Sequence, residues 1–318
     1  MSSTIDSVVA STSFEINSLS QLESFRDATN SGETFSGKTI NLNVNITLSK
    51  AWKSISNYYR KTNMDKWFAG EFNGNGHTIY GLTNNGLAFN DINTGYNSST
   101  PAGNTEYVYG LFGSVNGANI HDLKLSNVNI VFNTELLPDG VGALVGYSAG
   151  ATTIKNIEVN GSISGYDAVG GIVGRARGTS IVIDGCTNNA SVNSVRQCGG
   201  IAGQLGEFST LNTEVKNCVN NGAVTTKYIP DSEPKNSPNG YYWAAGIANF
   251  NWNPQNTNNK LTITNCQNTG IVGAGDAEYS QSHEIWGTCV APGNTVAAGF
   301  VVITGCTLRN GNSYSYSS

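Results

Sequence analysis

The sequence predicts an all-β protein, a single right-handed parallel β-helix (solenoid) with an N-terminal capping helix, from three observations. First, 38 of the 318 residues are Gly and 42 are Asn, and both residue types are unfavourable inside helices. Second, a unit of short apolar segments recurs along most of the chain. Third, no crossover-helix pattern separates these segments, so we expect the strands to bury their apolar faces by stacking coil upon coil.

Composition excludes several classes of protein. Only 12% of the residues are charged, and 17 basic against 22 acidic side chains give a net charge of −5. A nucleic-acid-binding protein needs a basic surface, so we expect no nucleic-acid partner. The apolar content of 38% argues against disorder. No apolar run is long enough for a transmembrane helix.

The chain begins with a segment that has no structural pattern. Residues 1–13 carry Asp6 and a short apolar run, not the basic and apolar regions of a signal peptide. We therefore expect a tail at 1–13 without a signal peptide. The predicted β-helix domain covers 14–318, with its cap at 14–48 and its coils at about 70–310.

The cap is predicted to contain one helix and one strand. Residues 18–30 place Leu19, Leu22 and Phe25 at helical spacing, and Ser18 is a suitable N-cap. Residues 39–46 then alternate strictly between polar and apolar types, which indicates a half-buried strand. A helix over the first coil would cover the open edge of a stacked sheet.

Two elements define the repeat. The first is a glycine-rich apolar strand, seen as Tyr109-Gly-Leu-Phe-Gly113, Gly142-Ala-Leu-Val-Gly146, Gly170-Gly-Ile-Val-Gly174, Gly199-Gly-Ile-Ala-Gly203 and Ala245-Gly-Ile-Ala-Asn249. The second is a four-residue element, seen as Ile120-His-Asp-Leu123, Ile154-Lys-Asn-Ile157, Ile183-Asp-Gly-Cys186, Val215-Lys-Asn-Cys218, Ile263-Thr-Asn-Cys266 and Ile303-Thr-Gly-Cys306. A third apolar stretch closes most units.

The spacing of the units separates two architectures. Successive second elements begin 34, 29, 32, 48 and 40 residues apart. A β-propeller blade needs four antiparallel strands, and an interval of 29 residues leaves little room for them. The long intervals indicate loops at 227–240, 250–260 and 276–285.

The motifs resemble a known family. Phe72-Asn-Gly-Asn-Gly-His-Thr-Ile-Tyr-Gly-Leu82, Gly110-Leu-Phe-Gly113 and the Gly-Gly-Ile-Val-Gly174 segment are similar to those of the GLUG-motif proteins, β-helical modules of bacterial surface and secreted proteins. The resemblance covers about residues 14–310. It implies a right-handed β-helix used in adhesion, in glycan contact or as a structural stalk, and it implies no catalytic residues.

Four cysteines fall in one column of the repeat. The position is Leu123 and Ile157 in earlier units and then Cys186, Cys218, Cys266 and Cys306. Because that position requires apolar volume, we expect free, buried thiols. Disulfides and a metal site are the alternatives, and a single ladder of thiols does not fit tetrahedral zinc. We expect no metal and no cofactor.

Asparagine also recurs at fixed positions. Asn188, Asn220 and Asn268 share one position, and Asn160, Asn189 and Asn221 share another. Asn tolerates turn conformations, and stacked amides can hydrogen-bond to one another. We therefore predict amide ladders at a corner, with ligand binding as the weaker alternative.

Aromatic residues gather in or beside the predicted loops and give the candidate binding residues, which are Tyr241, Tyr242, Trp243, Trp252, Tyr279 and Trp286. Rings exposed among Asn and Ser side chains are suited to stacking on neutral sugars. The alternative is that the rings pack the loops onto the coils.

Two functions are compared. The leading prediction is a non-catalytic structural or adhesive protein, extracellular or on a cell surface, appendage or virion, with a glycan, a surface protein or a further copy of itself as partner. The alternative is a polysaccharide lyase or glycoside hydrolase. Such an enzyme needs clustered carboxylates or a basic residue beside a calcium site. The sequence offers only Arg175 and Arg177, which we expect on a turn facing Asp184, and His283 beside Glu284.

Overall fold

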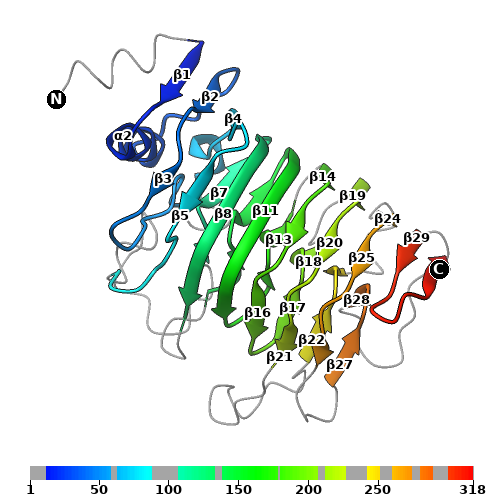
Figure 1. The fold of residues 1–318 in the computed structure, drawn as a ribbon. Coiled ribbons are helices and arrows are strands. Elements are labelled where there is room, and N and C mark those ends of the chain that lie inside the picture. Colours follow the sequence, from blue (N-terminus) through cyan, green and yellow to red (C-terminus); the bar gives the residue numbers. More distant parts are fainter. Residues whose placement is uncertain are drawn as a thin grey trace.

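The computed structural model describes residues 12–58, 63–87, 107–132, 138–177, 180–206, 212–226, 242–250, 260–273, 280–288 and 300–317. Strands predominate in these residues, which contain one α-helix, α2 (Leu19–Asn30), and one 3-10 turn, η1 (Met64–Lys66). The strands lie side by side in chain order, from β1 near the N-terminus to β29 near the C-terminus (Figure 1). The expected all-β class with stacked parallel sheets is confirmed.

Three sheets carry the strands of the described residues. Sheet 1 contains β1 (Ser13–Ile16), β2 (Thr39–Leu42), β3 (Ile46–Thr47), β4 (Glu71–Asn73), β5 (Thr78–Tyr80), β8 (Asn119–Val131), β11 (Ala151–Gly165), β14 (Ser180–Asp184), β15 (Thr187–Asn188), β16 (Ser191–Ser194), β19 (Asn212–Lys216), β20 (Val219–Asn220), β21 (Val224–Thr226), β24 (Lys260–Thr264), β25 (Gln267–Asn268), β26 (Val272–Gly273), β29 (Val301–Thr307) and β30 (Ser313–Ser317). Sheet 2 contains β7 (Phe112–Asn116), β10 (Val145–Ala149), β13 (Val173–Ala176), β18 (Ala202–Leu205), β23 (Ala248–Phe250) and β28 (Trp286–Thr288). Sheet 3 contains β6 (Val108–Tyr109), β9 (Gly140–Gly142), β12 (Val169–Gly170), β17 (Gln197–Gly199), β22 (Tyr242–Ala245) and β27 (Ser280–His283).

Sheet 1 holds one column of inward side chains along its whole length. Parallel pairing connects Phe14 of β1 to Ile303 of β29 through Ile40, Phe72, Ile120, Ile154, Ile183, Val215 and Ile263. All of these residues except Phe14 are fully buried. Parallel strands repeat about every 4.8 Å, so each side chain packs on its equivalents in the coils before and after it.

The glycine-rich repeat is a turn between two short strands, not the single strand that we expected. Val169–Gly170 belongs to sheet 3 and Val173–Ala176 belongs to sheet 2. A Cβ atom added to Gly174 would lie 2.4 Å from the backbone N of Val141. Sheets 2 and 3 therefore approach each other too closely there for any side chain.

The predicted capping helix is confirmed as α2. Ser18 is its N-cap, and the Ser18 hydroxyl accepts a hydrogen bond from the backbone N–H of Gln21 at 3.3 Å. Leu22 and Phe25 are fully buried, and the Phe25 ring packs edge-on against Phe68. The helix thus contributes its apolar face to the core of the first coils.

The thiol column is confirmed for the described cysteines. Cys186, Cys218, Cys266 and Cys306 are free and buried, and the pairing of flanking residues places each beside the next. Hydrogen bonding to Cys186, together with burial, raises the pKa of the Cys218 thiol well above its usual value. Cys198 pairs with Val169 and is also buried and free, as expected. Cys289 lies outside the described residues.

Two local expectations were wrong. The strand predicted over 39–46 is divided into β2 and β3, and the first strand is β1. The loop predicted at 276–285 contains β27, which pairs in parallel with β22. Within the described part of the chain, no helix is both long enough and apolar enough to cross a membrane.

Candidate functional site

A residue with positive φ recurs where each coil bends in sheet 1. The third residue of the repeated four-residue element adopts this conformation in every unit, and these residues form the corner column: Asp122, Asn156, Gly185, Asn217, Asn265 and Gly305, with φ between 53° and 65°. Asp, Asn and Gly are the residue types that tolerate left-handed backbone. The bend lets the first and fourth residues of the element both point inward, while the corner residue lies on the outer side.

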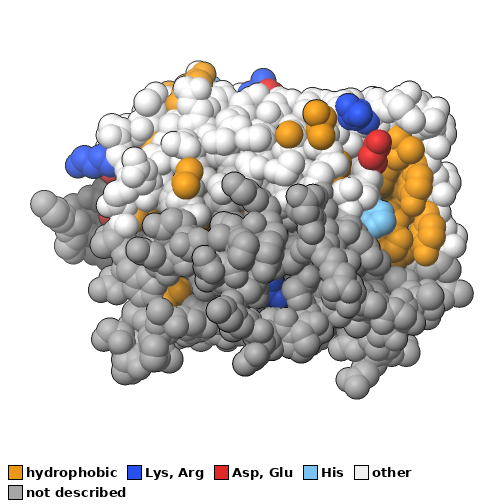
Figure 2. All heavy atoms as spheres, turned by 90° about the horizontal axis from the view of Figure 1, so that it is seen from below, with side chains coloured by type: hydrophobic (Ala, Val, Ile, Leu, Met, Phe, Trp, Pro, Cys, Tyr) orange, Lys and Arg blue, Asp and Glu red, His pale blue; other side chains and the backbone are white. Residues whose placement is uncertain are grey.

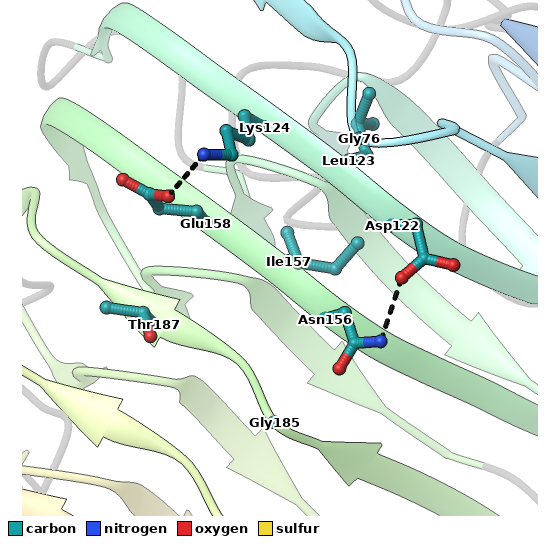
Figure 3. Close-up of a pocket in the computed structure, with 9 residues that line it drawn as sticks. All are labelled: Gly76, Asp122, Leu123, Lys124, Asn156, Ile157, Glu158, Gly185 and Thr187. Carbon is teal, nitrogen blue, oxygen red and sulfur yellow. Dashed lines mark hydrogen bonds and ion pairs between the residues drawn. The ribbon is translucent and has the colours of Figure 1, made fainter.

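A shallow groove lies beside the corner column on the outer face of sheet 1, with a volume of about 360 Å³. Its lining residues are Gly76, Asp122, Leu123, Lys124, Asn156, Ile157, Glu158, Gly185 and Thr187. Figure 3 shows Asp122 and Asn156 at one side and Lys124 and Glu158 at the other, contributed by the adjacent strands β8 and β11.

Two polar contacts join the neighbouring coils along the groove. The Asn156 Nδ2 donates to Asp122 Oδ1 at 2.8 Å, and the Lys124 Nζ lies 3.3 Å from Glu158 Oε2. The Asn160 amide donates to Glu158 Oε1 at 3.1 Å. This hydrogen bond is the main reason why the pKa of Glu158 lies below its usual value. Glu158 is therefore ionised at neutral pH.

A histidine lies between two carboxylates next to this groove. His121 Nδ1 is 2.7 Å from Asp122 Oδ2, and His121 Nε2 is 3.1 Å from Glu71 Oε1. The hydrogen bond to His121 lowers the pKa of Asp122. The hydroxyl of Thr39 donates to Glu71 Oε2 at 2.7 Å, and this contact is the largest cause of the lowered pKa of Glu71.

The groove carries both hydrogen-bond acceptors and hydrogen-bond donors. Ionised Asp122 and Glu158 accept hydrogen bonds, and Lys124, Asn156 and Thr187 carry groups that donate them. A glycoside hydrolase needs a carboxylic acid with a raised pKa as its proton donor, whereas the pKa values of Asp122 and Glu158 are lowered. No group of three His, Cys, Asp or Glu side chains able to hold a metal ion occurs in the residues that the structure describes.

Two amide ladders run along the stack, as the sequence predicted. In the inner amide ladder, Asn188 Nδ2 donates to Asn220 Oδ1 and Asn220 Nδ2 donates to Asn268 Oδ1, both at 2.8 Å. All three side chains of this ladder are fully buried. They also bond to backbone carbonyls, so the amides satisfy one another and the turns that they support.

The outer amide ladder is formed by Asn160, which is partly buried, and by Asn189 and Asn221, which are exposed. Asn189 Nδ2 donates to Asn160 Oδ1 at 3.1 Å, and Asn221 Nδ2 donates to Asn189 Oδ1 at 2.8 Å. Asn160 in turn donates to Glu158 in the groove. The outer ladder therefore ends on a groove carboxylate.

The candidate aromatic residues are only partly within the described chain. Tyr241, Trp252 and Tyr279 lie outside the described residues, and Tyr242 is described only as part of the backbone of β22. Trp243 is 4% exposed and Trp286 is 9% exposed. Their burial favours the packing alternative for these two rings, and ligand contact by the candidate residues stays a prediction.

The expected position of Arg175 was wrong. Arg175 lies on β13, is buried, and does not face Asp184. Its Nη2 atom lies 2.8 Å from Asp139 Oδ1 and 3.1 Å from Asp167 Oδ2. This ion cluster could not be predicted from the sequence, because Asp139 and Asp167 precede strands of sheet 3 and no spacing rule relates them to Arg175.

The contacts of His121 with Glu71 and Asp122 were not expected from the sequence; its side chain lies on the outer face of β8 and is 19% exposed. A signal was present in the sequence. Asp122 occupies the Asn or Gly position of the repeated element, and Asn156 follows one unit later. That column predicts a carboxylate stacked beneath an amide.

Comparison with known proteins gives partial similarities. No protein-family model matches the chain. The chain is 30% identical over 166 residues to halomucin of Haloquadratum walsbyi, a match that covers 52% of this chain and 2% of halomucin. It is 30% identical over 105 residues to an immunoglobulin A1 protease of Streptococcus sanguinis, covering 32% of this chain and 5% of the protease. It is 27% identical over 176 residues to the zinc metalloprotease ZmpC of Streptococcus pneumoniae, covering 48% of this chain and 9% of ZmpC.

A solved structure is similar in fold. It is the crystal structure of a Bacteroides ovatus protein assigned as an immunoglobulin A1 protease, with a TM-score of 0.56 and 16% sequence identity. The match covers 93% of this chain and 74% of that chain. The chain spans less than a tenth of the length of the curated relatives.

The similarity to proteases does not include a His-Glu-x-x-His zinc motif. That motif places two histidines four residues apart on a helix. The histidines of this sequence are His77, His121 and His283, and the segment that starts with His283-Glu284 has Gly287 in place of the second histidine. His283 lies on β27, a strand. The Glu284 carboxylate accepts a hydrogen bond from the backbone N–H of Arg309 at 2.6 Å.

Proposed function

We propose that this chain is a rigid, non-catalytic β-helix module that acts outside the cell as a structural or adhesive element. It would form one right-handed solenoid over residues 14–318, of the GLUG type. The observation that carries the proposal is the unbroken inward column from Phe14 to Ile303. Stacking of every coil on its neighbours favours a stiff body whose outer face is available for contact.

The relatives support an extracellular role. Two of them are named as proteases, one for immunoglobulin A1, an antibody class that is found outside cells. This chain matches only a small part of each and lacks the zinc-protease motif. A role in presentation or attachment, not in peptide cleavage, is consistent with both facts.

The ligand that we propose is a neutral glycan, with a surface protein as a further partner class. The groove supports this because Asp122 and Glu158 are ionised acceptors in an open position beside amide and hydroxyl donors. Sugar hydroxyls bond to this combination of groups. The candidate residues Tyr241, Tyr242, Trp252 and Tyr279 would add stacking contacts.

A glycan array probed with the purified chain tests the proposal, and Glu158→Gln is the informative variant. We expect this variant to weaken binding about 10-fold, since a charged acceptor contributes about 1.5 kcal/mol. Glu214→Gln is the matched control, because Glu214 lies on the same face of sheet 1 and is not part of the groove. If Glu158→Gln leaves the glycan affinity unchanged, the glycan binds outside the groove. If the chain binds no glycan on the array, the proposal of a glycan ligand is wrong and only the structural role remains.

The alternative function is a polysaccharide lyase or glycoside hydrolase. It is favoured by one observation, the placement of His121 between Glu71 and Asp122 at the edge of the groove. Incubation with acidic and neutral polysaccharides, followed by measurement of reducing ends and unsaturated products, separates the two functions. Products that disappear in His121→Gln would establish an enzyme.

A further inference from the structure

The outer amide ladder is continued along the stack by a threonine. Thr269 follows Asn221 in the register of the coils, and its hydroxyl donates to Asn221 Oδ1 at 2.6 Å. At the other end of the ladder, Asn160 donates to Glu158 Oε1 at 3.1 Å. Side chains from successive coils therefore form one row of hydrogen bonds that ends on a carboxylate of the groove.

A second column of side chains runs beside this ladder on the outer face of sheet 1. It lies two residues further along each coil and contains Ser162, Ser191, Ala223 and Ile271. We call the outer amide ladder, Thr269 and this column together the neutral strip. None of its residues is charged, and each is exposed or partly exposed. Figure 2 views the molecule from the side on which β16 and β21 end, and the described residues that it shows there are mainly uncharged.

The neutral strip combines free donors with exposed apolar surface. A primary amide carries two N–H donors, and the ladder uses one of them in Asn189 and one in Asn221. Ile271 is 61% exposed, the highest value among the large apolar side chains of the described residues. A sugar ring has C–H groups on its faces and hydroxyl groups at its edge. A surface that offers both apolar groups and amide donors therefore suits it.

Charge distinguishes the neutral strip from another part of the same outer face. The column aligned with His121 carries Lys155, Asp184 and Lys216. An anionic polymer would need Lys or Arg along its path, because contacting surfaces carry complementary charge. The neutral strip has none, so it favours an uncharged polymer.

We infer that the neutral strip extends the groove, and that the ligand is a linear neutral polysaccharide lying along the stack. The inference rests on the proposed function. Coils repeat about every 4.8 Å, a spacing close to the length of one sugar residue in an extended chain. Successive sugar residues would therefore lie over successive coils, from Glu158 in the groove to Ile271 at the far end of the strip.

Oligomers of β-1,4-linked glucose, mannose and xylose, each as a dimer and as a hexamer, test the inference by titration calorimetry. We expect the dimer in the groove and the hexamer across both the groove and the neutral strip. Asn221→Ala should weaken binding of the hexamer about 5-fold, because it removes one neutral hydrogen bond, and should leave binding of the dimer unchanged. Ile271→Ser should also weaken only the hexamer, about 3-fold, through loss of apolar contact.

Two further variants make the comparison specific. Asn217→Gly is the matched control, since Asn217 is an exposed amide of the same coil as Asn221 and lies outside both the groove and the neutral strip. Gly185 and Gly305 occupy this position in other coils, so the variant should keep its fold and bind both oligomers as the wild type does. Glu158→Gln should weaken both oligomers. Far-UV circular dichroism and thermal unfolding check that every variant is folded.

The variants decide the inference, because a hexamer also offers several registers to a single site. If Glu158→Gln weakens the hexamer while Asn221→Ala and Ile271→Ser do not, the inference is wrong and the groove remains the glycan site. If Asn221→Ala weakens dimer and hexamer equally, the ladder acts only through Glu158, and the inference is wrong as well.

The choice of glycans separates the inference from the proposed function. If other glycans on the array bind and none of these oligomers does, only the inference fails. If neither the oligomers nor any glycan on the array binds, the proposed glycan ligand is wrong, and the inference fails with it.

Discussion

A Cβ atom on Gly200 would lie 2.3 Å from Cγ of Asn220. The same relationship holds for Gly171 with Asn188 and for Gly246 with Asn268, at 2.5 Å in both. The buried amide occupies the space that a side chain of the turn would fill, so the two positions are linked.

The link explains which coils lack glycine at this turn. In one coil the residue aligned with the buried Asn is Val159, and the residue aligned with the turn Gly is Ala143. In the last coil the residue aligned with the buried Asn is Leu308, and the residue aligned with the turn Gly is Glu284. Glycine is required there only in coils that carry the inner amide ladder.

Gly200→Ala tests this packing. The added methyl group would contact both Asn220 and the carbonyl oxygen of Gly246, 2.1 Å away, and we expect a loss of about 3 kcal/mol in the free energy of unfolding. Gly273→Ala is the control, since its nearest atom is Thr225 Cγ2 at 3.7 Å, and it should change stability by less than about 0.5 kcal/mol. Urea unfolding measures both variants, and equal stabilities would contradict the steric argument.

The thiol column gives a second prediction. Burial and mutual hydrogen bonding raise the pKa values of Cys218 and Cys266, so a thiol reagent should modify these residues only after denaturation. Cys218→Asp should lose several kcal/mol, about 3 to 5, because an unpaired carboxylate would be buried.

Cys218→Val is the matched control for this prediction, since earlier coils hold aliphatic residues at that position, and it should cost less than about 1.5 kcal/mol. Rapid labelling of the native column by the reagent would show that the core is open.

The low pKa values of Glu71, Asp122 and Glu158 predict acid sensitivity. A carboxyl group whose pKa is lower in the folded than in the unfolded state stabilises the fold above its unfolded value and loses this contribution as pH falls through the folded value. Stability should therefore decline as the pH is lowered below 4.5, the ordinary value for Glu.

Asn160→Ala isolates one part of this effect. It removes the hydrogen bond that mainly lowers the pKa of Glu158, so that pKa should move up toward its ordinary value while the pKa of Glu71 stays as it is. Carboxyl chemical shifts recorded against pH give both values in one experiment. An unchanged Glu158 titration would assign its low pKa to Lys124 instead.

The Arg175 cluster predicts a large effect of a single charge deletion. In Arg175→Met, Asp139 and Asp167 lose the guanidinium that lies between them, and we expect a loss of about 3 to 5 kcal/mol. Adding Asp139→Asn to this variant should restore part of the stability, because it removes one of the two carboxylates. Arg309→Met, at an exposed position, is the control in thermal unfolding.

Much of the fold could be predicted from the sequence because each structural position of a repeated fold is occupied several times along the chain. The burial of Cys218 could be predicted because Leu123 and Ile157 occupy the same position in other coils. The amide ladders could be predicted because Asn recurs at the same position of successive repeats. Structural features that occur only once in the chain could not be predicted in this way. The contact of Arg175 with Asp139 depends on two sheets meeting, and β30 has no equivalent in the other coils.

The candidate site was predictable only in part for the same reason. His121 and Asp122 belong to the first of the repeated four-residue elements, whereas Glu71 lies before these elements, so the proximity of the three residues follows from strand register and not from spacing. The aromatic residues were selected by composition alone, which does not distinguish an exposed ring from a buried one such as Trp243.

The two amide ladders run in opposite directions. Donors of the inner ladder point toward the C-terminal coil, from Asn188 to Asn220, whereas donors of the outer ladder point toward the N-terminal coil, from Asn189 to Asn160. Aligned amide dipoles add along a ladder, and opposed neighbouring ladders cancel. A coil added between these residues would therefore lengthen both ladders without adding a net dipole along the stack, so the electrostatics of the ladders would not limit the number of coils.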